Sequence, residues 1–200
     1  MELLNTLNSI VGILFMLCYS YQIVYVIVVL VRKPPQLPDA PKHRYAVLIS
    51  ARNEQAVIAN LIHSIRSQNY PSKLVDAYVV ADNCTDATAA VAREAGAVVW
   101  ERFNKQNVGK GYALKFLYEK ICACFPDKRY DGYFVFDADN LLDENYIFEM
   151  NKVFGAGHRI VTSYRNSKNC GSNWISAGYA LWFQRESKFL NSARMLLGTS

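Results

Sequence analysis

The chain lacks charge in one long stretch near its N-terminus. No Asp, Glu, Lys or Arg lies between Ile10 and Val31, and Val, Ile, Leu and Tyr dominate these 22 residues. As a helix, this run is about 33 Å long, enough to cross a bilayer core about 30 Å thick. The run is too long for a signal peptide and no small-residue cleavage site follows it. A buried core helix is a further alternative, and we predict that residues 1–32 are a membrane anchor.

Basic residues flank this run on one side only. Arg32 and Lys33 follow it directly, whereas Glu2 is the only charged side chain before it. The positive-inside rule therefore predicts a single pass of a cell membrane, with the N-terminus outside and the following domain in the cytoplasm. Residues 33–44 contain four prolines, which indicates a stiff juxtamembrane linker.

Cysteine patterns typical of metal or redox sites are absent. The five cysteines are odd in number, and Cys122-Ala-Cys124 has neither C-x-x-C spacing nor a second pair to complete a zinc site. Reduced thiols in a cytosolic domain are therefore the default expectation. The net charge of +5 is modest. Because no basic stripe interleaved with aromatic residues is present, we predict no nucleic-acid partner.

The common phosphate-binding loops are also absent. Gly109-Lys110-Gly111 comes nearest to a P-loop, but position 104 is Asn where that motif needs Gly, and position 111 is Gly where it needs Ser or Thr. No G-x-G-x-x-G follows the first predicted strand. The sequence thus predicts neither a P-loop nor a dinucleotide-binding loop.

Strands and helices alternate after the linker, which predicts an α/β fold with a mainly parallel sheet flanked by helices. Ile58, Leu61, Ile62 and Ile65, for example, follow the i, i+3, i+4, i+7 spacing of one helix face, in a helix that stops before Pro71. The expected strands are Tyr45–Ser50, Val75–Ala81, Ala97–Trp100, Gly132–Phe136 and Arg159–Tyr164. The other expected helices are Thr85–Ala95, Gly111–Phe125, Glu144–Phe154 and the aromatic Trp174–Leu197.

Polar residues follow four of these strands at one edge of the sheet, where ligands bind in parallel sheets. The four groups are Ser50–Glu54, Ala81–Asp86, Asn104–Gly111 and Asp137–Asp139. Each alone has an ordinary explanation, such as helix capping or a flexible turn. Together they supply an acid for a base or ribose, a cation for phosphate and an acid pair for a metal. Those are the groups that a bound nucleoside diphosphate needs.

Asp137-Ala138-Asp139 is the most informative of these groups, because it ends an apolar strand and no Lys or Arg adjoins it in the sequence. Two carboxylates there repel each other, and their burial costs several kcal/mol unless each is paired or binds a metal. A divalent ion would remove the conflict and could hold a diphosphate at the same time. A turn at Asp139 with Asp137 as a helix cap is the alternative.

The order of four segments resembles the family 2 glycosyltransferases of the GT-A fold, over about Tyr45 to Ser200. The segments are Ser50-Ala-Arg-Asn-Glu54, Ala81-Asp-Asn-Cys-Thr-Asp86, Gly109-Lys-Gly-Tyr-Ala-Leu114 and Phe136-Asp-Ala-Asp-Asn140. The resemblance implies an inverting hexosyltransferase that moves a sugar from a nucleotide-sugar to a glycan or lipid acceptor.

The resemblance also implies a set of site residues. The implied nucleotide-sugar contacts are Ala51, Arg52, Asn53, Glu54, Asp82, Asn83, Lys110, Asp137, Ala138 and Asp139. Asp82 is expected to contact the nucleobase, and its fit to the ring N–H of uracil weakly favours UDP-sugars. Asp139, with Asp137 beside it, is expected to hold Mg²⁺ or Mn²⁺.

The chain departs from the family pattern in two places. The acidic general base and the Gln-x-x-Arg-Trp of processive members are not found before Ser200, and the nearest acid, Glu186, is better explained as a solvated helical charge. We therefore expect the base to lie beyond Ser200 and residues 45–200 to be a GT-A domain without its C-terminal part.

Two alternatives stay open from the sequence. The segment Val135–Asn140 also resembles the nucleophile motif of haloacid-dehalogenase-like phosphatases, but Leu141 and the late position of the motif disfavour that reading. The other alternative is a non-catalytic, membrane-tethered subunit that binds a nucleotide-sugar.

Overall fold

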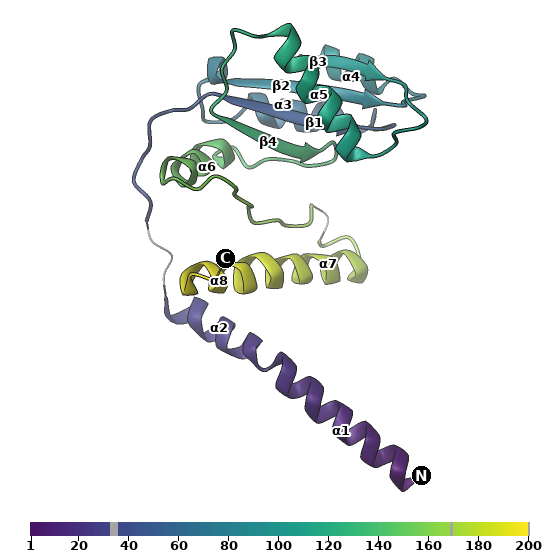
Figure 1. Cartoon of the computed structure of the whole chain (residues 1–200), viewed down its shortest axis with the longest axis vertical. Helices are drawn as coiled ribbons and strands as arrows, with labels where there is room; N and C mark the ends of the chain where they lie inside the picture. Colours follow the sequence, from purple (N-terminus) through teal and green to yellow (C-terminus); the bar gives the residue numbers. More distant parts are fainter. Residues whose placement is uncertain (33–35, 169, 200) are drawn as a thin grey trace. The chain divides into compact units, whose positions relative to one another are not determined.

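The computed structural model describes residues 1–32, 36–168 and 170–199 (Figure 1). It contains two compact units. We call Leu37–Arg159 the sheet unit, and Met1–Gln36 together with Ile160–Ser200 the helical unit. Lys33, Pro34 and Pro35 of the predicted linker lie outside the described residues.

The sheet unit is built on four strands: β1 (Tyr45–Ala51), β2 (Val75–Asp82), β3 (Val98–Arg102) and β4 (Gly132–Asp137). Their order is β3-β2-β1-β4, and all three pairings are parallel. The predicted parallel sheet is therefore confirmed. Since all strands run the same way, their carboxyl ends share one edge.

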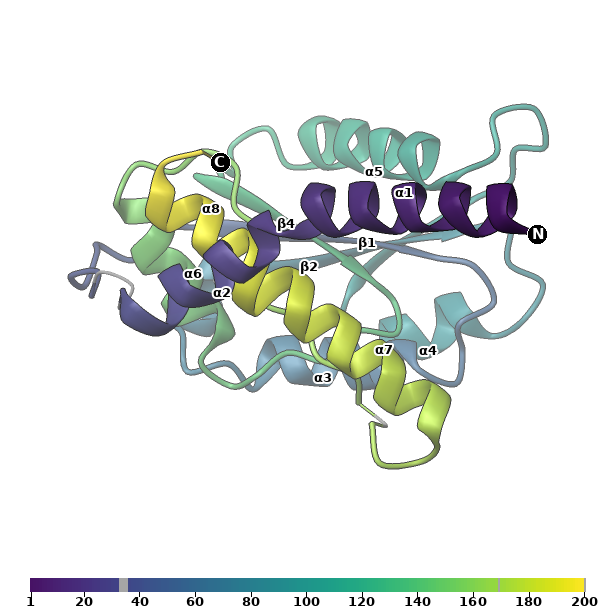
Figure 2. The same cartoon turned by 90° about the horizontal axis from the view of Figure 1, so that it is seen from below.

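Helices cover both faces of this sheet (Figure 2). Residues of β1 alternate between the two faces, because successive side chains of a strand point in opposite directions. Val47 and Ile49 pack with α3 (Ile58–Arg66), in a cluster that also includes Ala92 of α4 (Thr88–Glu94). Ala46 and Leu48 pack on the other face with Leu117 and Ile121 of α5 (Lys110–Cys124). The 3₁₀ turn Ser72–Leu74 and α6 (Tyr146–Gly155) complete the unit.

The predicted apolar face of α3 is confirmed. All four of its periodic residues, from Ile58 to Ile65, are buried against the sheet. The other predicted helices of the sheet unit are also present. Two of them begin later than predicted, α4 at Thr88 and α6 at Tyr146, and α5 begins one residue earlier, at Lys110.

The predicted strand Arg159–Tyr164 is wrong. The structure assigns no strand to these residues, and Ile160 is 92% exposed. A short apolar run forms a strand only where a neighbouring strand accepts its hydrogen bonds and a core covers its side chains. The sheet order places no fifth strand beside β4 or β3 in the described part of the chain.

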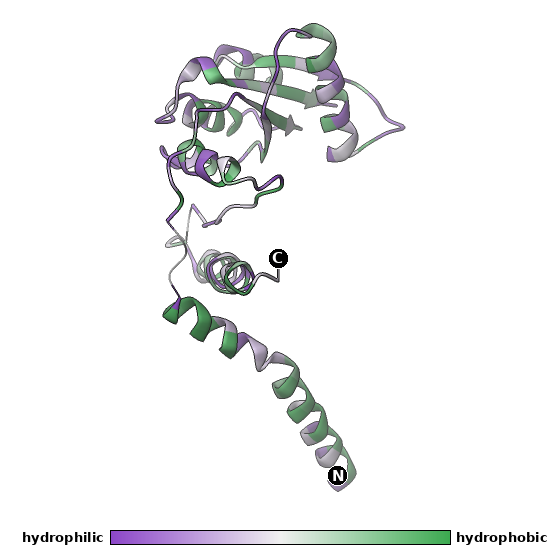
Figure 3. Ribbon diagram, turned by 60° about the vertical axis from the view of Figure 1, so that its left-hand side comes forward, coloured by the Kyte–Doolittle hydropathy of each residue, from purple (hydrophilic) through white to green (hydrophobic). Residues whose placement is uncertain are grey.

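The helical unit contains α1 (Glu2–Tyr19), α2 (Tyr21–Val31), α7 (Trp174–Gln184), a π-helical segment (Arg185–Asn191) and α8 (Ser192–Leu197). Together α1 and α2 form a candidate membrane span of 30 residues, by length and composition, which Figure 3 shows as mostly apolar. The helix thus begins well before Ile10, where the uncharged run starts. The predicted helix Trp174–Leu197 is confirmed as α7, the π segment and α8 in succession.

A polar cluster stabilises the amino end of the sheet. Asp76 of β2 accepts hydrogen bonds from Tyr130 Oη (2.7 Å), Arg44 Nη2 (3.1 Å) and Lys128 Nζ (3.1 Å). Burial by itself would raise the pKa of Asp76, but these three donors outweigh it and hold the pKa below its usual value. Asp76 therefore contributes stability that is present above the unfolded-state pKa of about 3.9 and is lost as the pH falls through the folded-state value.

We predict that Asp76→Asn lowers the free energy of unfolding by roughly 1–2 kcal/mol near pH 7, because it weakens hydrogen bonds to a charged acceptor. The deficit should shrink as the pH falls below about 3.9, where wild-type Asp76 also becomes neutral. Urea unfolding of the full chain in detergent micelles measures both. Asp127→Asn, an exposed acid in the same region, is the matched control and should change little. A deficit independent of pH would contradict this account.

Candidate functional site

The carboxyl edge of the sheet brings together residues from three strands. Asp137, the last residue of β4, is in register with Ser50 of β1, and Ala51 is in register with Ala81, the residue before Asp82. The order β2-β1-β4 therefore places Asp82 and Asp137 on either side of the β1 end. The common edge inferred from the sequence is confirmed by the parallel pairing.

Hydrogen bonds join the loop after β1 to the loop after β2. Asn53 Oδ1 accepts hydrogen bonds from the backbone N–H (2.8 Å) and hydroxyl (3.3 Å) of Thr85. The Glu54 N–H donates to Thr88 Oγ1 (2.8 Å), and the Thr88 hydroxyl donates to Asp86 Oδ1 (2.5 Å). That hydroxyl is the main cause of the lowered pKa of Asp86. The loop Ala51–Glu54 is thus held in one shape, with Arg52 exposed beside the sheet edge.

Two asparagines of the predicted site have a structural reason to be asparagine. Asn53 and Asn83 have φ angles of 57° and 52°, in the left-handed region that Asn tolerates better than most residues. Asn83 also exchanges hydrogen bonds with Asn104: its Nδ2 donates to Asn104 O (3.1 Å) and its Oδ1 accepts from Asn104 N (2.9 Å). Both side chains therefore fix loops at the site.

Asp82 forms a buried ion pair that the sequence did not predict. Arg102 Nη1, at the end of β3, donates to Asp82 Oδ1 (2.5 Å), and both side chains are less than 10% exposed. Arg102 Nη2 also donates to Asn107 O (2.6 Å) in the loop that leads to α5. One guanidinium thus joins the carboxylate at the end of β2 to the loop before Lys110.

Lys110 and Asp137 form a second ion pair at the same edge. Lys110 Nζ, in the first turn of α5, contacts Asp137 Oδ1 at the end of β4. No basic residue adjoins the acid pair in the sequence, but the fold brings one there from 27 positions away. About half of each side chain is exposed, so this pair can exchange partners with a ligand more easily than the buried Asp82–Arg102 pair.

The remaining residues of the acid motif form a tight turn. The Asn140 N–H donates to Asp137 O (3.0 Å), Ala138 is 4% exposed, and Asp139 lies on the surface of this turn. Asn140 Oδ1 is buried and has no hydrogen-bond partner among the residues that the structure describes. The turn therefore presents several oxygen atoms of the kind that hard divalent cations bind.

A divalent cation fits this edge only in part. The described residues contain no group of three or more His, Cys, Asp or Glu that could hold a metal ion. Mg²⁺ in nucleotide sites is commonly held by one or two carboxylates together with substrate phosphates. Asp137 and Asp139 meet that smaller requirement. The donor set suits a metal that arrives with a diphosphate rather than a metal bound by protein alone.

A sequence model of the family described as "Glycosyltransferase like family 2" matches residues 41–196. The chain belongs to this family.

Parts of the chain are also similar to individual known proteins. The chain is similar to 4,4'-diaponeurosporenoate glycosyltransferase of Staphylococcus aureus (strain MRSA252), with 49% identity over 53 residues, which are 26% of this chain and 13% of that protein. The mannosyltransferase PcManGT of Pyrobaculum calidifontis, solved with GDP-Man and Mn²⁺, has a TM-score of 0.56 and 18% identity over 74% of this chain and 44% of that chain. That likeness shows the GT-A-like fold.

A structure of TarS from Staphylococcus aureus in complex with UDP is a more distant match, with a TM-score of 0.45 and 14% identity over 63% of this chain and 42% of that chain. The chain thus spans less than half the length of these proteins.

The buried pair leads to a prediction about stability. Arg102→Ala should lower the free energy of unfolding of the sheet unit by about 3–5 kcal/mol, because it leaves the buried Asp82 carboxylate without its positively charged partner. Arg93→Ala is the matched control, since it breaks the exposed pair with Glu101, the residue next to Arg102 in β3, and should cost at most about 1 kcal/mol. Urea unfolding of the full chain, followed by fluorescence, measures both. Equal losses would contradict a special role for Arg102.

Proposed function

We propose that this chain binds the donor in a membrane-bound enzyme that transfers a sugar from a nucleotide-sugar to a glycan or lipid acceptor, with inversion at the sugar. Family membership supports glycosyl transfer. The observation that carries the proposal is the carboxyl edge, where one rigid, buried carboxylate and one exposed, exchangeable ion pair lie on either side of β1.

The nucleobase end of the proposed site is at Asp82. Arg102 and Asn83 both donate to Oδ1, so the charge and direction of this carboxylate are fixed before a ligand arrives. With Oδ1 occupied, Oδ2 is the atom we assign to an N–H of the base. Uracil offers such a ring N–H, and we therefore favour a UDP-sugar. The loop Ala51–Glu54 would line the nucleotide from the β1 side.

The diphosphate end of the proposed site is at Lys110, Asp137 and Asp139. Binding of the diphosphate exchanges the Lys110–Asp137 pair for a contact between Lys110 Nζ and a phosphate oxygen. That exchange frees Asp137 to act with Asp139 as a ligand of Mg²⁺ or Mn²⁺. A bound divalent ion would neutralise charge on the leaving diphosphate. Lys110 adds positive charge at the same place, and α5 directs its N-terminus there.

Of the two alternatives drawn from the sequence, one loses support and the other needs an experiment. The phosphatase alternative loses support, because the chain belongs to a glycosyltransferase-like family and its acid motif ends β4, at the edge of the described sheet. The non-catalytic alternative predicts the same donor binding without transfer, so an assay of sugar transfer separates it from our proposal.

The metal assignment can be tested by calorimetry. Titration of UDP into the full chain in detergent should show binding that Mn²⁺ strengthens. Asp139→Asn should weaken binding in Mn²⁺ by about 1.5–3 kcal/mol, the range for losing an interaction with a charged group, and should leave binding without Mn²⁺ unchanged.

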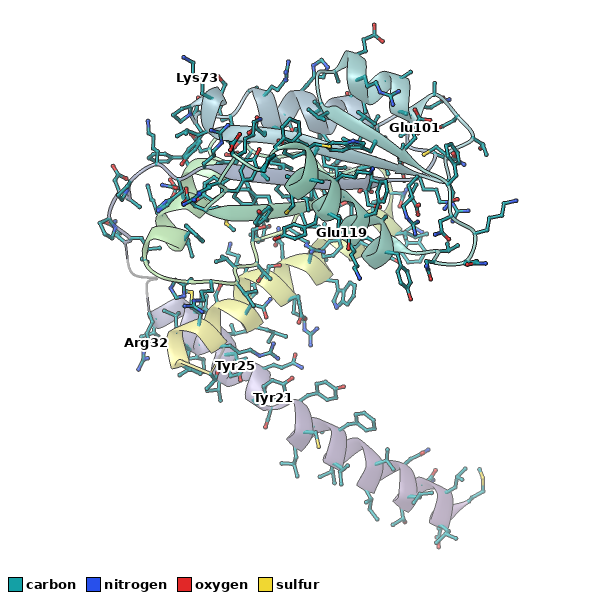
Figure 4. The ribbon with its side chains drawn as sticks, turned by 45° about the horizontal axis from the view of Figure 1, so that its top comes forward. Tyr21, Tyr25, Arg32, Lys73, Glu101 and Glu119 are labelled. Carbon is teal, nitrogen blue, oxygen red and sulfur yellow. The ribbon has the colours of Figure 1, made fainter. Side chains whose placement is uncertain are left out.

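The control for this experiment is Glu119→Gln, which removes an exposed carboxylate on α5 (Figure 4). It should bind UDP as the wild type does. If Asp139→Asn kept the full effect of Mn²⁺, the metal assignment would be wrong.

We also propose that residues 1–32 anchor the protein, residues 33–44 link anchor and domain, and the domain from residue 45 onward faces the cytoplasm. Trypsin added to intact cells should then leave the sheet unit undigested, because it lies behind the membrane, and should digest it once the cells are permeabilised. Immunoblotting for the sheet unit measures both. Digestion in intact cells would place the domain outside, away from cytosolic nucleotide-sugars.

A further inference from the structure

The last helical segment, Trp174–Leu197, packs across the end of the candidate membrane span. Two polar contacts fix this packing: Arg185 Nη2 donates to Gln22 Oε1 (2.9 Å), and Arg32 Nη1 donates to Leu196 O (3.2 Å). The two helices run in the same sense, because Arg185 meets Gln22 near the start of α2 and Leu196 meets Arg32 at its end. In Figure 3 the segment Trp174–Leu197 is seen nearly end-on, whereas α1 and α2 are seen from the side. The segment therefore crosses α2 at an angle.

The contact uses one face of each helix. On α2, the half-buried residues are Gln22, Tyr25, Val28 and Val29, which recur every three or four positions as one helix face does. On the segment Trp174–Leu197, Leu190 of the π-helical segment and Ala193 of α8 are buried. The packing therefore leaves the remaining surface of both helices uncovered within the helical unit.

The uncovered surface of α7 is strongly apolar and aromatic. We call five of its residues the aromatic patch: Trp174, Ile175, Tyr179, Leu181 and Trp182, which are 84%, 52%, 56%, 68% and 54% exposed. Four of them, with Gly178, line a shallow hollow of about 440 Å³. An exposed cluster of large apolar side chains marks an interaction surface rather than a surface that faces water.

We infer that the aromatic patch lies in the interfacial layer of a lipid bilayer, with Trp174–Leu197 parallel to the membrane plane. The first argument is continuity, because the helix is packed on α2, and α2 is the end of the candidate span that carries Arg32. The exposed residues of α2, such as Ile23, Ile27 and Leu30, are as apolar as the patch. One lipid environment therefore suits both surfaces.

Composition supports the same occupant. Trp and Tyr are enriched where membranes meet water, because their rings are apolar and their N–H or O–H groups remain able to reach water or headgroups. Beyond the patch, the segment carries Arg185, Lys188 and Arg194 against the single acid Glu186. This excess of positive charge complements anionic lipid headgroups, as in other helices that lie in the interface.

The length of the span agrees with a helix lying at its end. The 30 residues of α1 and α2 are about 45 Å long, longer than a bilayer core of about 30 Å. The excess is taken up by tilt or by leaving an end in the interface. Either brings the α2 end, with Arg32 and α8 beside it, to the headgroup level.

Tryptophan fluorescence tests this inference in the full chain, because the chain has three tryptophans and two are in the patch. Trp100→Phe leaves Trp174 and Trp182 as reporters. The double variant Trp174→Phe, Trp182→Phe leaves Trp100, which stacks on Tyr78 in the core of the sheet unit and is the control. Trp100→Tyr provides a second background if the Phe variant does not fold. The proteins are reconstituted into vesicles of phosphatidylcholine and phosphatidylglycerol with brominated acyl chains.

We expect the brominated lipid to remove more than half of the patch fluorescence and to leave the Trp100 signal almost unchanged. Iodide in water should quench the patch weakly. Strong quenching by iodide without quenching by the lipid would place the patch in water and overturn the inference. Quenching by neither would place it against protein and would overturn it too. Alkaline carbonate extraction of the same vesicles tests the anchor separately, so a failed anchor is distinguished from a wrongly placed helix.

Discussion

The buried ion pair between Asp82 and Arg102 is the interaction on which the rest of the candidate site depends. A charge in this position is stable only with a partner, so the pair fixes the ends of β2 and β3 relative to each other. Through Asn107, the same guanidinium also holds the loop that leads to Lys110. A rigid acid on one side of the carboxyl end of β1 and an exchangeable lysine on the other side are thus positioned by a single side chain.

Local patterns predicted the scaffold well, because their causes are local. The periodic residues of α3 and the apolar strands β1, β2 and β4 needed only helix and strand periodicity, and the parallel sheet followed from alternation of the two. The site was predictable as an edge, since parallel strands place their carboxyl ends together. The expected roles of individual residues at that edge remain predictions.

Three features were outside the reach of sequence patterns. Arg102 meets Asp82 across 20 positions and Lys110 meets Asp137 across 27, and such pairings depend on strand order, which no local pattern specifies. Residues 159–164 were predicted as a strand because Ile160, Val161 and Tyr164 favour strands, yet a strand also needs a partner, and the described sheet offers none. The structural role of Asn53 and Asn83 likewise depends on backbone angles that composition does not reveal.

The central claim is that a nucleotide lies across the carboxyl edge, with its base at Asp82 and its diphosphate at Asp137 and Asp139. Diffraction from crystals of the full chain grown with UDP and Mn²⁺ tests it most directly, because anomalous scattering locates the metal independently of the protein. The account predicts a manganese peak within coordination distance of an Asp139 oxygen, uracil against Asp82, and Lys110 on a phosphate. A nucleotide bound at the amino end of the sheet, or manganese away from Asp137 and Asp139, would contradict it.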